Sequence, residues 1–139
     1  MKKDIRLGVN IDHVATIRNA RNEGYPNITE VASLLKDIDV DLITVHLRED
    51  RRHIKDKDVE ILRKNNYLPL NIEMAATNEM KKIGLKTNPS SCCIVPERRE
   101  ELTTEGGLDV KNQKKFLGDF ITEIIKSDIK LSLFVDPDI

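Results

Sequence analysis

Five short apolar segments divide the chain, and this division limits its possible folds more than any other feature. The segments are rich in valine, isoleucine and leucine, and they comprise residues 6–11, 41–46, 68–74, 91–96 and 130–136. Short continuous apolar segments are typical of buried strands in parallel sheets. We therefore predict five strands.

Stretches with helical periodicity lie between these segments. They follow residues of the types that cap helix N-termini, namely Asn27, Asp56, Thr77 and Asp109. The last stretch has the clearest stripe, because its apolar residues recur at intervals of three and four: Leu117, Phe120, Ile121, Ile124 and Ile125. We therefore predict four helices that alternate with the strands.

This order of elements predicts an α/β fold with a parallel sheet and right-handed crossovers. Both an open doubly wound sheet and a TIM (β/α)8 barrel satisfy it. An open sheet usually has a glycine-rich first turn at its ligand site, whereas in a barrel several strand ends contribute polar residues. The stretch NIDHVATIRNARN after the first strand contains no glycine. We therefore predict the TIM barrel family.

The length of the chain conflicts with a closed barrel. We expect its 139 residues to form one domain, 1–139, whereas a closed TIM barrel has eight strands and about 250 residues. We therefore expect an incomplete, truncated barrel of about five strands and four helices. Such a sheet exposes the edges of its first and fifth strands. Either the sequence is a fragment, or another copy or chain completes the sheet.

Charge and hydropathy argue against several classes of partner. The chain has 23 basic and 24 acidic side chains, so its overall charge does not attract nucleic acid or anionic lipid. No apolar run approaches the ~20 residues of a membrane helix, and the start MKKDIRLGVN lacks the apolar core of a signal peptide. We expect a cytoplasmic protein that binds neither nucleic acid nor membranes.

Polar side chains follow each of the first four predicted strands. They are Asn10, Asp12, His13, His46, Arg48, Glu73, Glu97, Arg98 and Arg99. The carboxyl ends of parallel strands meet at one side of a barrel, where barrel enzymes have their active sites. We therefore expect these side chains to share one rim.

Two of these residues suggest acid/base chemistry. Glu73 ends an apolar strand, and partial desolvation there raises the pKa of a carboxyl group toward the range of a general base. A structural glutamate that bonds to a neighbouring strand end explains the same position equally well. His46 lies on the adjacent strand at the same end, which favours an acid/base pair.

The segment TVHLREDRRH, residues 44–53, places arginines directly after the second strand. Guanidinium groups match phosphate and carboxylate oxygens, so we expect Arg48 to hold an anionic substrate. We assign Arg51 and Arg52 instead to a solvated loop whose charges alternate in sign. TTEGGLDV, residues 103–110, is a weak phosphate-binding pattern before a helix. No lysine lies at a strand exit, which disfavours a Schiff-base aldolase.

The chain resembles the pyridoxine 5′-phosphate synthase family of the deoxyxylulose-dependent vitamin B6 route in five stretches: GVNIDHVATIRNAR, TVHLREDRRHI, NIEMA, CCIVPERREELTTEGGLDV and LSLFVD. The resemblance implies a (β/α)8 barrel that assembles as a homo-oligomer. It also implies condensation of 3-amino-2-oxopropyl phosphate with 1-deoxy-D-xylulose 5-phosphate to pyridoxine 5′-phosphate, phosphate and water. No cofactor is expected, because the amine that forms the imine belongs to the substrate, and no metal site is expected.

The resemblance also implies roles for the matching residues. It assigns acid/base catalysis to His46 and Glu73. It assigns contacts with the aminoketone phosphate to Asn10 and Arg21. The residues that would hold the deoxyxylulose phosphate are Asp12, His13, Arg48, His53 and Thr103.

Members of this family continue through three further strands, which supply another catalytic histidine and a glycine-rich phosphate cup. We therefore expect the 139-residue chain to be inactive by itself. Two other interpretations stay open. One is a non-catalytic half-barrel that binds a sugar phosphate or pairs with another chain. The other is a metal-dependent barrel, whose ligands would be His13, His46, His53 and Glu73; these residue types suit zinc, although no short spacing enforces a site.

Overall fold

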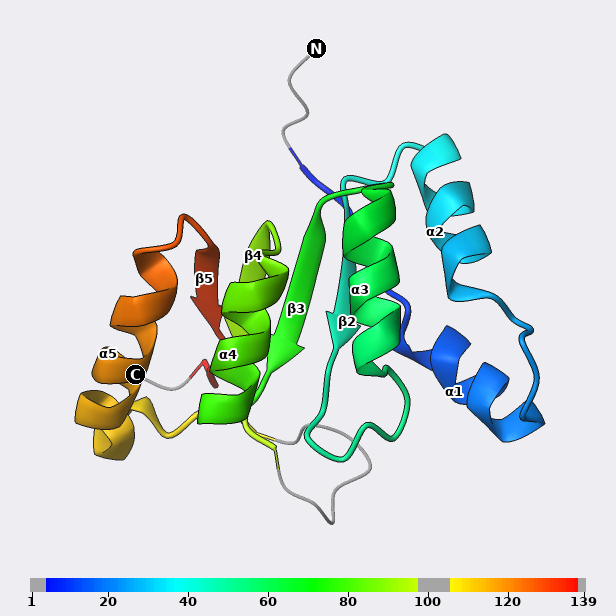
Figure 1. Ribbon diagram of the computed structural model, residues 1–139. Coiled ribbons are helices and arrows are strands. Elements are labelled where there is room, and N and C mark those ends of the chain that lie inside the picture. The colour runs from blue at the N-terminus through cyan, green and yellow to red at the C-terminus, as the bar shows by residue number, and fades with distance from the viewer. Residues whose placement is uncertain (1–4, 98–105, 138–139) are drawn as a thin grey trace.

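The structure, a computed structural model, describes residues 5–97 and 106–137 (Figure 1). Its elements are β1 (Gly8–Asn10), α1 (Asp12–Arg21), α2 (Ile28–Asp37), β2 (Leu42–His46), α3 (Asp56–Asn65), β3 (Leu70–Met74), α4 (Asn78–Thr87), β4 (Ser91–Ile94), α5 (Val110–Ile125) and β5 (Lys130–Leu133). All five predicted strands are confirmed, each within its predicted segment. None of the described helices is long and apolar enough to cross a membrane.

The strands form one parallel sheet in the order β1-β2-β3-β4-β5. Each strand pairs with the next in sequence, so the order contains no reversal of the kind that creates the switch point of a doubly wound sheet. Right-handed crossovers between successive neighbours place the connecting helices on the same face, and α2 to α5 cover one side of the sheet (Figure 1). The α/β fold with a parallel sheet is confirmed.

The hydrophobic core lies between this face and the helices. Strand residues that point toward the helices are apolar and fully buried, as in Val45, Ile72 and Ile94, and they pack in one cluster with residues of α2 to α5. The opposite face carries polar, partly exposed side chains. The two faces differ because β2, β3 and β4 alternate between apolar and polar residues with the two-residue period of a strand.

Strand register arranges the polar face in two rows. The first row, nearer the amino ends of the strands, consists of Thr44, Asn71 and Ser91. Asn71 donates to the hydroxyl of Thr44 at 3.3 Å and accepts from the hydroxyl of Ser91 at 2.8 Å. The second row lies two residues nearer the carboxyl ends and consists of His46, Glu73, Cys93 and Ser132. The register therefore places an imidazole and a carboxylate side by side.

Three of the four predicted helix caps are confirmed. Asn27 accepts from the N–H of Thr29 at 2.9 Å, Thr77 caps α4, and Asp109 caps α5. The cap predicted at Asp56 was wrong, because Asp56 is the first residue of α3 and Lys55 occupies the capping position. The N–H of Lys55 instead donates to the carboxylate of Asp58, three residues further along, at 2.9 Å.

The structure contains a fifth helix, α1, that we did not predict. Its capping position is Ile11, whose apolar side chain cannot accept a hydrogen bond. Only Asp12 and Ala15 of its ten residues are buried. The usual start signal and a broad apolar stripe are therefore both missing. The charge pattern was the available signal, since an acidic residue in the first turn and arginines in the last turn favour a helix.

Adjacent residues of β2 test this layered arrangement. Ile43 faces the helices and is 2% exposed, whereas Leu42 faces the polar side and is only partly buried. We expect Ile43→Ala to lower the free energy of unfolding by about 2–5 kcal/mol, because it leaves a cavity in the core. Leu42→Ala should cost less than about 1 kcal/mol. Urea titration of both variants measures the difference, and equal losses would contradict the assignment of faces.

Candidate active site

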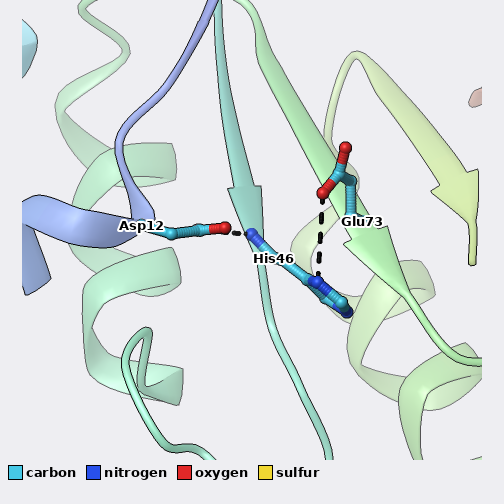
Figure 2. Close-up of side chains that lie close together, drawn as sticks. All are labelled: Asp12, His46 and Glu73. Atoms are coloured by element: carbon cyan, nitrogen blue, oxygen red, sulfur yellow. Dashed lines mark hydrogen bonds and ion pairs between the residues drawn. The ribbon is translucent and has the colours of Figure 1, made fainter. Parts of the chain in front are cut away.

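Three of the predicted site residues meet at the carboxyl ends of β1, β2 and β3. Asp12, His46 and Glu73 each present one nitrogen or oxygen atom, and these atoms lie within 4.8 Å of one another (Figure 2). They come from three consecutive strand exits, as the barrel hypothesis predicts. The structure therefore brings both proposed catalysts and one proposed substrate contact to one place.

Asp12 joins the exit of β1 to the exit of β2. Its own N–H donates to the side-chain oxygen of Asn10 at 2.8 Å, and the Asn10 amide donates back to Oδ2 of Asp12 at 2.9 Å. The other oxygen, Oδ1, accepts from the backbone N–H of His46 at 2.7 Å. Asp12 is buried, so these bonds are little exposed to competing water. They fix the backbone from which the His46 ring projects.

The ring of His46 lies between two carboxylates. Its Nδ1 is 3.9 Å from Oε2 of Glu73, which is an ion-pair distance and too long for a hydrogen bond. Its Nε2 is 2.8 Å from Oε1 of Glu97. Glu97 follows β4, and its second oxygen accepts from the backbone N–H of Glu49 at 3.1 Å. The two ring nitrogens therefore face different partners.

The two glutamates have pKa values shifted in opposite directions. Burial raises the pKa of Glu73, with a smaller contribution from the negative charge of Asp12 and partial opposition from His46. Burial also raises the pKa of Glu97, but its hydrogen bonds from His46 and from the N–H of Glu49, together with Arg48, hold the net pKa below the usual range. Glu97 therefore remains ionised while Glu73 more readily takes up a proton. Two carboxyl groups whose pKa values are shifted in opposite directions suit acid/base catalysis.

Arg48 and His53 lie in the loop after β2, close to this group. Arg48 is 4% exposed, and its Nε lies 3.7 Å from the Asp50 carboxylate. The His53 ring lies 6.1 Å from that of His46 between centroids, and its Nδ1 accepts from the N–H of Ile54. Burial lowers the pKa of His53, and the positive charges around it lower it further despite Asp12. The loop after β2 thus contributes the buried guanidinium of Arg48 to the site. It also contributes the His53 imidazole, which stays neutral more readily than an ordinary histidine.

Contacts with α1 and with neighbouring carboxylates hold this loop in place. The Asn19 amide donates to the backbone oxygen of His53 at 2.9 Å. Arg51 forms ion pairs with Asp56 at 2.8 Å and Glu79 at 2.6 Å, and these partners raise its pKa. Arg52 pairs with the Asp50 carboxylate at 2.7 Å. As predicted, Arg51 and Arg52 neutralise acidic groups of the loop and its surroundings.

Other predicted residues are not part of this group. Arg21 ends α1, roughly 14 Å along the helix axis from Asp12, and it forms an exposed ion pair with Glu23 at 2.9 Å. His13 is exposed, and its Nδ1 lies 3.4 Å from the hydroxyl of Thr16. Thr103 lies outside the described residues, as do Arg98 and Arg99. Their proposed roles therefore stay predictions.

The two glycines before α5 have different structural explanations. A Cβ atom at Gly107 would collide with the backbone of Val135 and Asp136, so only glycine fits against the exit of β5. The N–H of Leu108 also donates to the backbone oxygen of Phe134 at 2.8 Å. Close packing against the segment after β5 explains Gly107, and a positive φ of 75° explains Gly106, so neither glycine requires a phosphate.

The zinc hypothesis finds little support in this geometry. The described side chains that could hold a metal ion together are Asp12, His46 and Glu73. This group lacks His13 and His53, two of the four ligands that the hypothesis requires. Both oxygens of Asp12 already accept hydrogen bonds, and Nε2 of His46 already faces Glu97. The described group therefore differs from the ligand set that the zinc hypothesis requires.

We expected Glu97 at a strand exit but predicted no role for it. Its contact with His46 crosses from β4 to β2, strands that β3 separates by about 9.5 Å. The pairing of neighbouring strands does not predict a contact of this kind. The only signal was its position, since Glu97 follows β4 after two residues and so extends beyond the sheet edge.

Comparison with known proteins adds an independent finding. Residues 7–139 match the family described as "Pyridoxal phosphate biosynthesis protein PdxJ". The chain is 56% identical over 135 residues to proteins named pyridoxine 5′-phosphate synthase from Thioalkalivibrio sulfidiphilus and Ehrlichia ruminantium. Each match covers 97% of this chain, and 55% and 57% of the respective relative. The chain thus spans about half the length of the curated relatives it matches.

The opposite pKa shifts of the two glutamates can be measured directly. We expect the Glu73 carboxyl to lose its proton at a pH above the ordinary glutamate value of about 4.3, because burial disfavours its charged form. Glu97 should lose its proton below that value, because its hydrogen bonds favour the charged form. Carbon-13 NMR of the carboxyl groups between pH 2 and 8 measures both midpoints, with Glu73→Gln and Glu97→Gln as assignment controls. A higher midpoint for Glu97 than for Glu73 would contradict the site electrostatics.

Proposed function

The chain belongs to the pyridoxal phosphate biosynthesis protein PdxJ family, and from this premise we propose that it functions as a pyridoxine 5′-phosphate synthase. In this reaction 3-amino-2-oxopropyl phosphate and 1-deoxy-D-xylulose 5-phosphate condense to pyridoxine 5′-phosphate, phosphate and water. Both proposed substrates are phosphorylated. The proposal requires no cofactor, since the reacting amine comes from the substrate.

The position of His46 between two carboxylates of opposite pKa shift carries the proposal. Imine formation, loss of phosphate and ring closure each require protons to be delivered and removed at nearby atoms. In our proposal Glu73 exchanges protons with the substrates, since a raised pKa brings a carboxyl group nearer the working pH. His46 relays protons beside it. The ionised Glu97 would stabilise the imidazolium that forms when His46 accepts a proton.

Charged and polar groups beside this pair suit a sugar phosphate. In our proposal the guanidinium of Arg48 binds phosphate oxygens, while Asp12 and His53 bind the deoxyxylulose hydroxyl groups. His13 and Thr103 complete that substrate's contacts in the proposal. Asn10 and Arg21 would contact the aminoketone phosphate. The exposed position of Arg21 means that this last contact requires a substrate or a neighbouring subunit to reach the end of α1.

The sheet also supports a proposal about architecture. We propose that the five strands form part of a (β/α)8 barrel in which the polar face, with Thr44, Asn71 and Glu73, points to the barrel interior. Homo-oligomeric assembly and a cytoplasmic location belong to the same proposal. Because the chain matches only 55–57% of the length of its relatives, we further propose that the 139 residues contribute to this reaction but do not catalyse it alone.

A chimera tests the proposed reaction. The 135 matching residues would replace the corresponding part of the Thioalkalivibrio sulfidiphilus relative, and formation of pyridoxine 5′-phosphate from both substrates would be measured. We expect turnover by the chimera and none by the 139-residue chain. Glu73→Gln in the chimera should lower kcat by roughly 10²–10⁴-fold, the usual contribution of a general acid/base.

The control is Lys64→Ala, which removes an exposed charge near the C-terminal end of α3, away from the strand exits, and should leave kcat unchanged. A folded chimera that fails to form product, or a Glu73→Gln variant with full activity, would contradict the proposed function.

A further inference from the structure

We propose that Glu97 is a positioning residue that fixes the proton of the neutral His46 ring on Nε2, so that Nδ1 is the basic nitrogen and faces Glu73. The catalytic meaning of this inference rests on the proposed function. The inference itself concerns one tautomer and one orientation, which can be measured without turnover.

Glu97 and His46 make a direct, buried side-chain contact. Oε1 of Glu97 lies 2.8 Å from Nε2 of His46, and the side chains are only 6% and 7% exposed. An ionised carboxylate has no proton to donate and can only accept. A hydrogen bond at this distance therefore requires a proton on Nε2. The other neutral tautomer would place the Nε2 lone pair against a carboxylate oxygen in a nearly dry environment, which is strongly unfavourable.

Glu97 is itself held in place. Its Oε2 accepts from the N–H of Glu49, so both of its oxygens have partners from β2 or the loop that follows it. The N–H of Val95 continues the pairing of β4 with β3 by donating to the backbone oxygen of Met74 at 3.0 Å. Pro96 then restricts the backbone directly before Glu97. The carboxylate therefore reaches His46 from a constrained segment.

The tautomer determines which nitrogen of the His46 ring can accept a proton from the remainder of the site. With the proton on Nε2, Nδ1 carries a lone pair and lies 3.9 Å from Oε2 of Glu73. Asp12 fixes the backbone N–H of His46 from a third side. The neutral ring then accepts a proton at Nδ1, and the resulting imidazolium returns it from the same atom, beside the carboxyl group whose pKa is raised. A buried carboxylate orients a catalytic imidazole in the same way in serine-protease triads.

The test is long-range proton–nitrogen NMR of the nitrogen-15-labelled 139-residue chain near pH 8, where an ordinary histidine is neutral. The chain contains three histidines, and His46→Gln identifies the signals of His46. We expect a pattern with Nε2 protonated and Nδ1 unprotonated in the wild type. Glu97→Ala should shift His46 to a mixture of tautomers, whereas Glu97→Gln keeps an acceptor oxygen and should retain the Nε2-protonated form.

Glu49→Ala is the matched control. It removes a neighbouring exposed carboxylate of the same charge but keeps the backbone N–H that binds Glu97, so the tautomer should not change. A wild-type ring protonated on Nδ1, or an unchanged tautomer in folded Glu97→Ala, would overturn the inference. If Glu97→Ala does not fold, a wild-type ring protonated on Nδ1 would still overturn the inference.

The outcome is independent of the proposed reaction. A protonated Nε2 in a protein whose chimera forms no product would support positioning by Glu97 and reject the synthase. A protonated Nδ1 in an active protein would reject the positioning role alone.

Discussion

The register between β2 and β3 is the constraint on which the site depends. It pairs His46 with Glu73 at the carboxyl ends of two neighbouring parallel strands. A shift of one residue would turn His46 toward the helices and bring Val45 to the polar face, because side chains alternate along a strand. The buried residues of β2 prevent such a shift, since it would expose Ile43 and Val45. Packing on one face of the sheet therefore fixes the chemistry on the other.

The same asymmetry explains how the site remains charged although several of its residues are buried. Buried charges are unfavourable unless hydrogen bonds or opposite charges compensate them. Asp12 and Glu97 each accept two hydrogen bonds from described groups, and these bonds compensate for their burial. Glu73 has no comparable bonds to donors among the described residues, and its pKa rises accordingly. The structure thus separates carboxylates that hold the site together from one that is suited to exchange protons.

Much of this arrangement follows from local sequence patterns. Apolar segments located the strands, and Asn27, Thr77 and Asp109 located helix starts, because these features depend on neighbouring residues only. The helix α1 was missed because its cap, Ile11, gives no signal and few of its residues are buried. The contact between His46 and Glu97 was not predictable, since it joins two strands that are not neighbours and depends on how the exits converge. Convergence of strand exits is a property of the whole sheet.

Our central claim is that these exits form one site for a small phosphorylated molecule. A crystal structure of the chain with 1-deoxy-D-xylulose 5-phosphate tests it most directly. We predict that the ligand lies at the carboxyl ends of β1 to β4, with its phosphate near Arg48 and an oxygen within about 2.6–3.2 Å of His46 or Glu73, the reach of an acid/base catalyst. A ligand bound at the opposite end of the sheet, or His46 and Glu73 on different faces, would contradict the account.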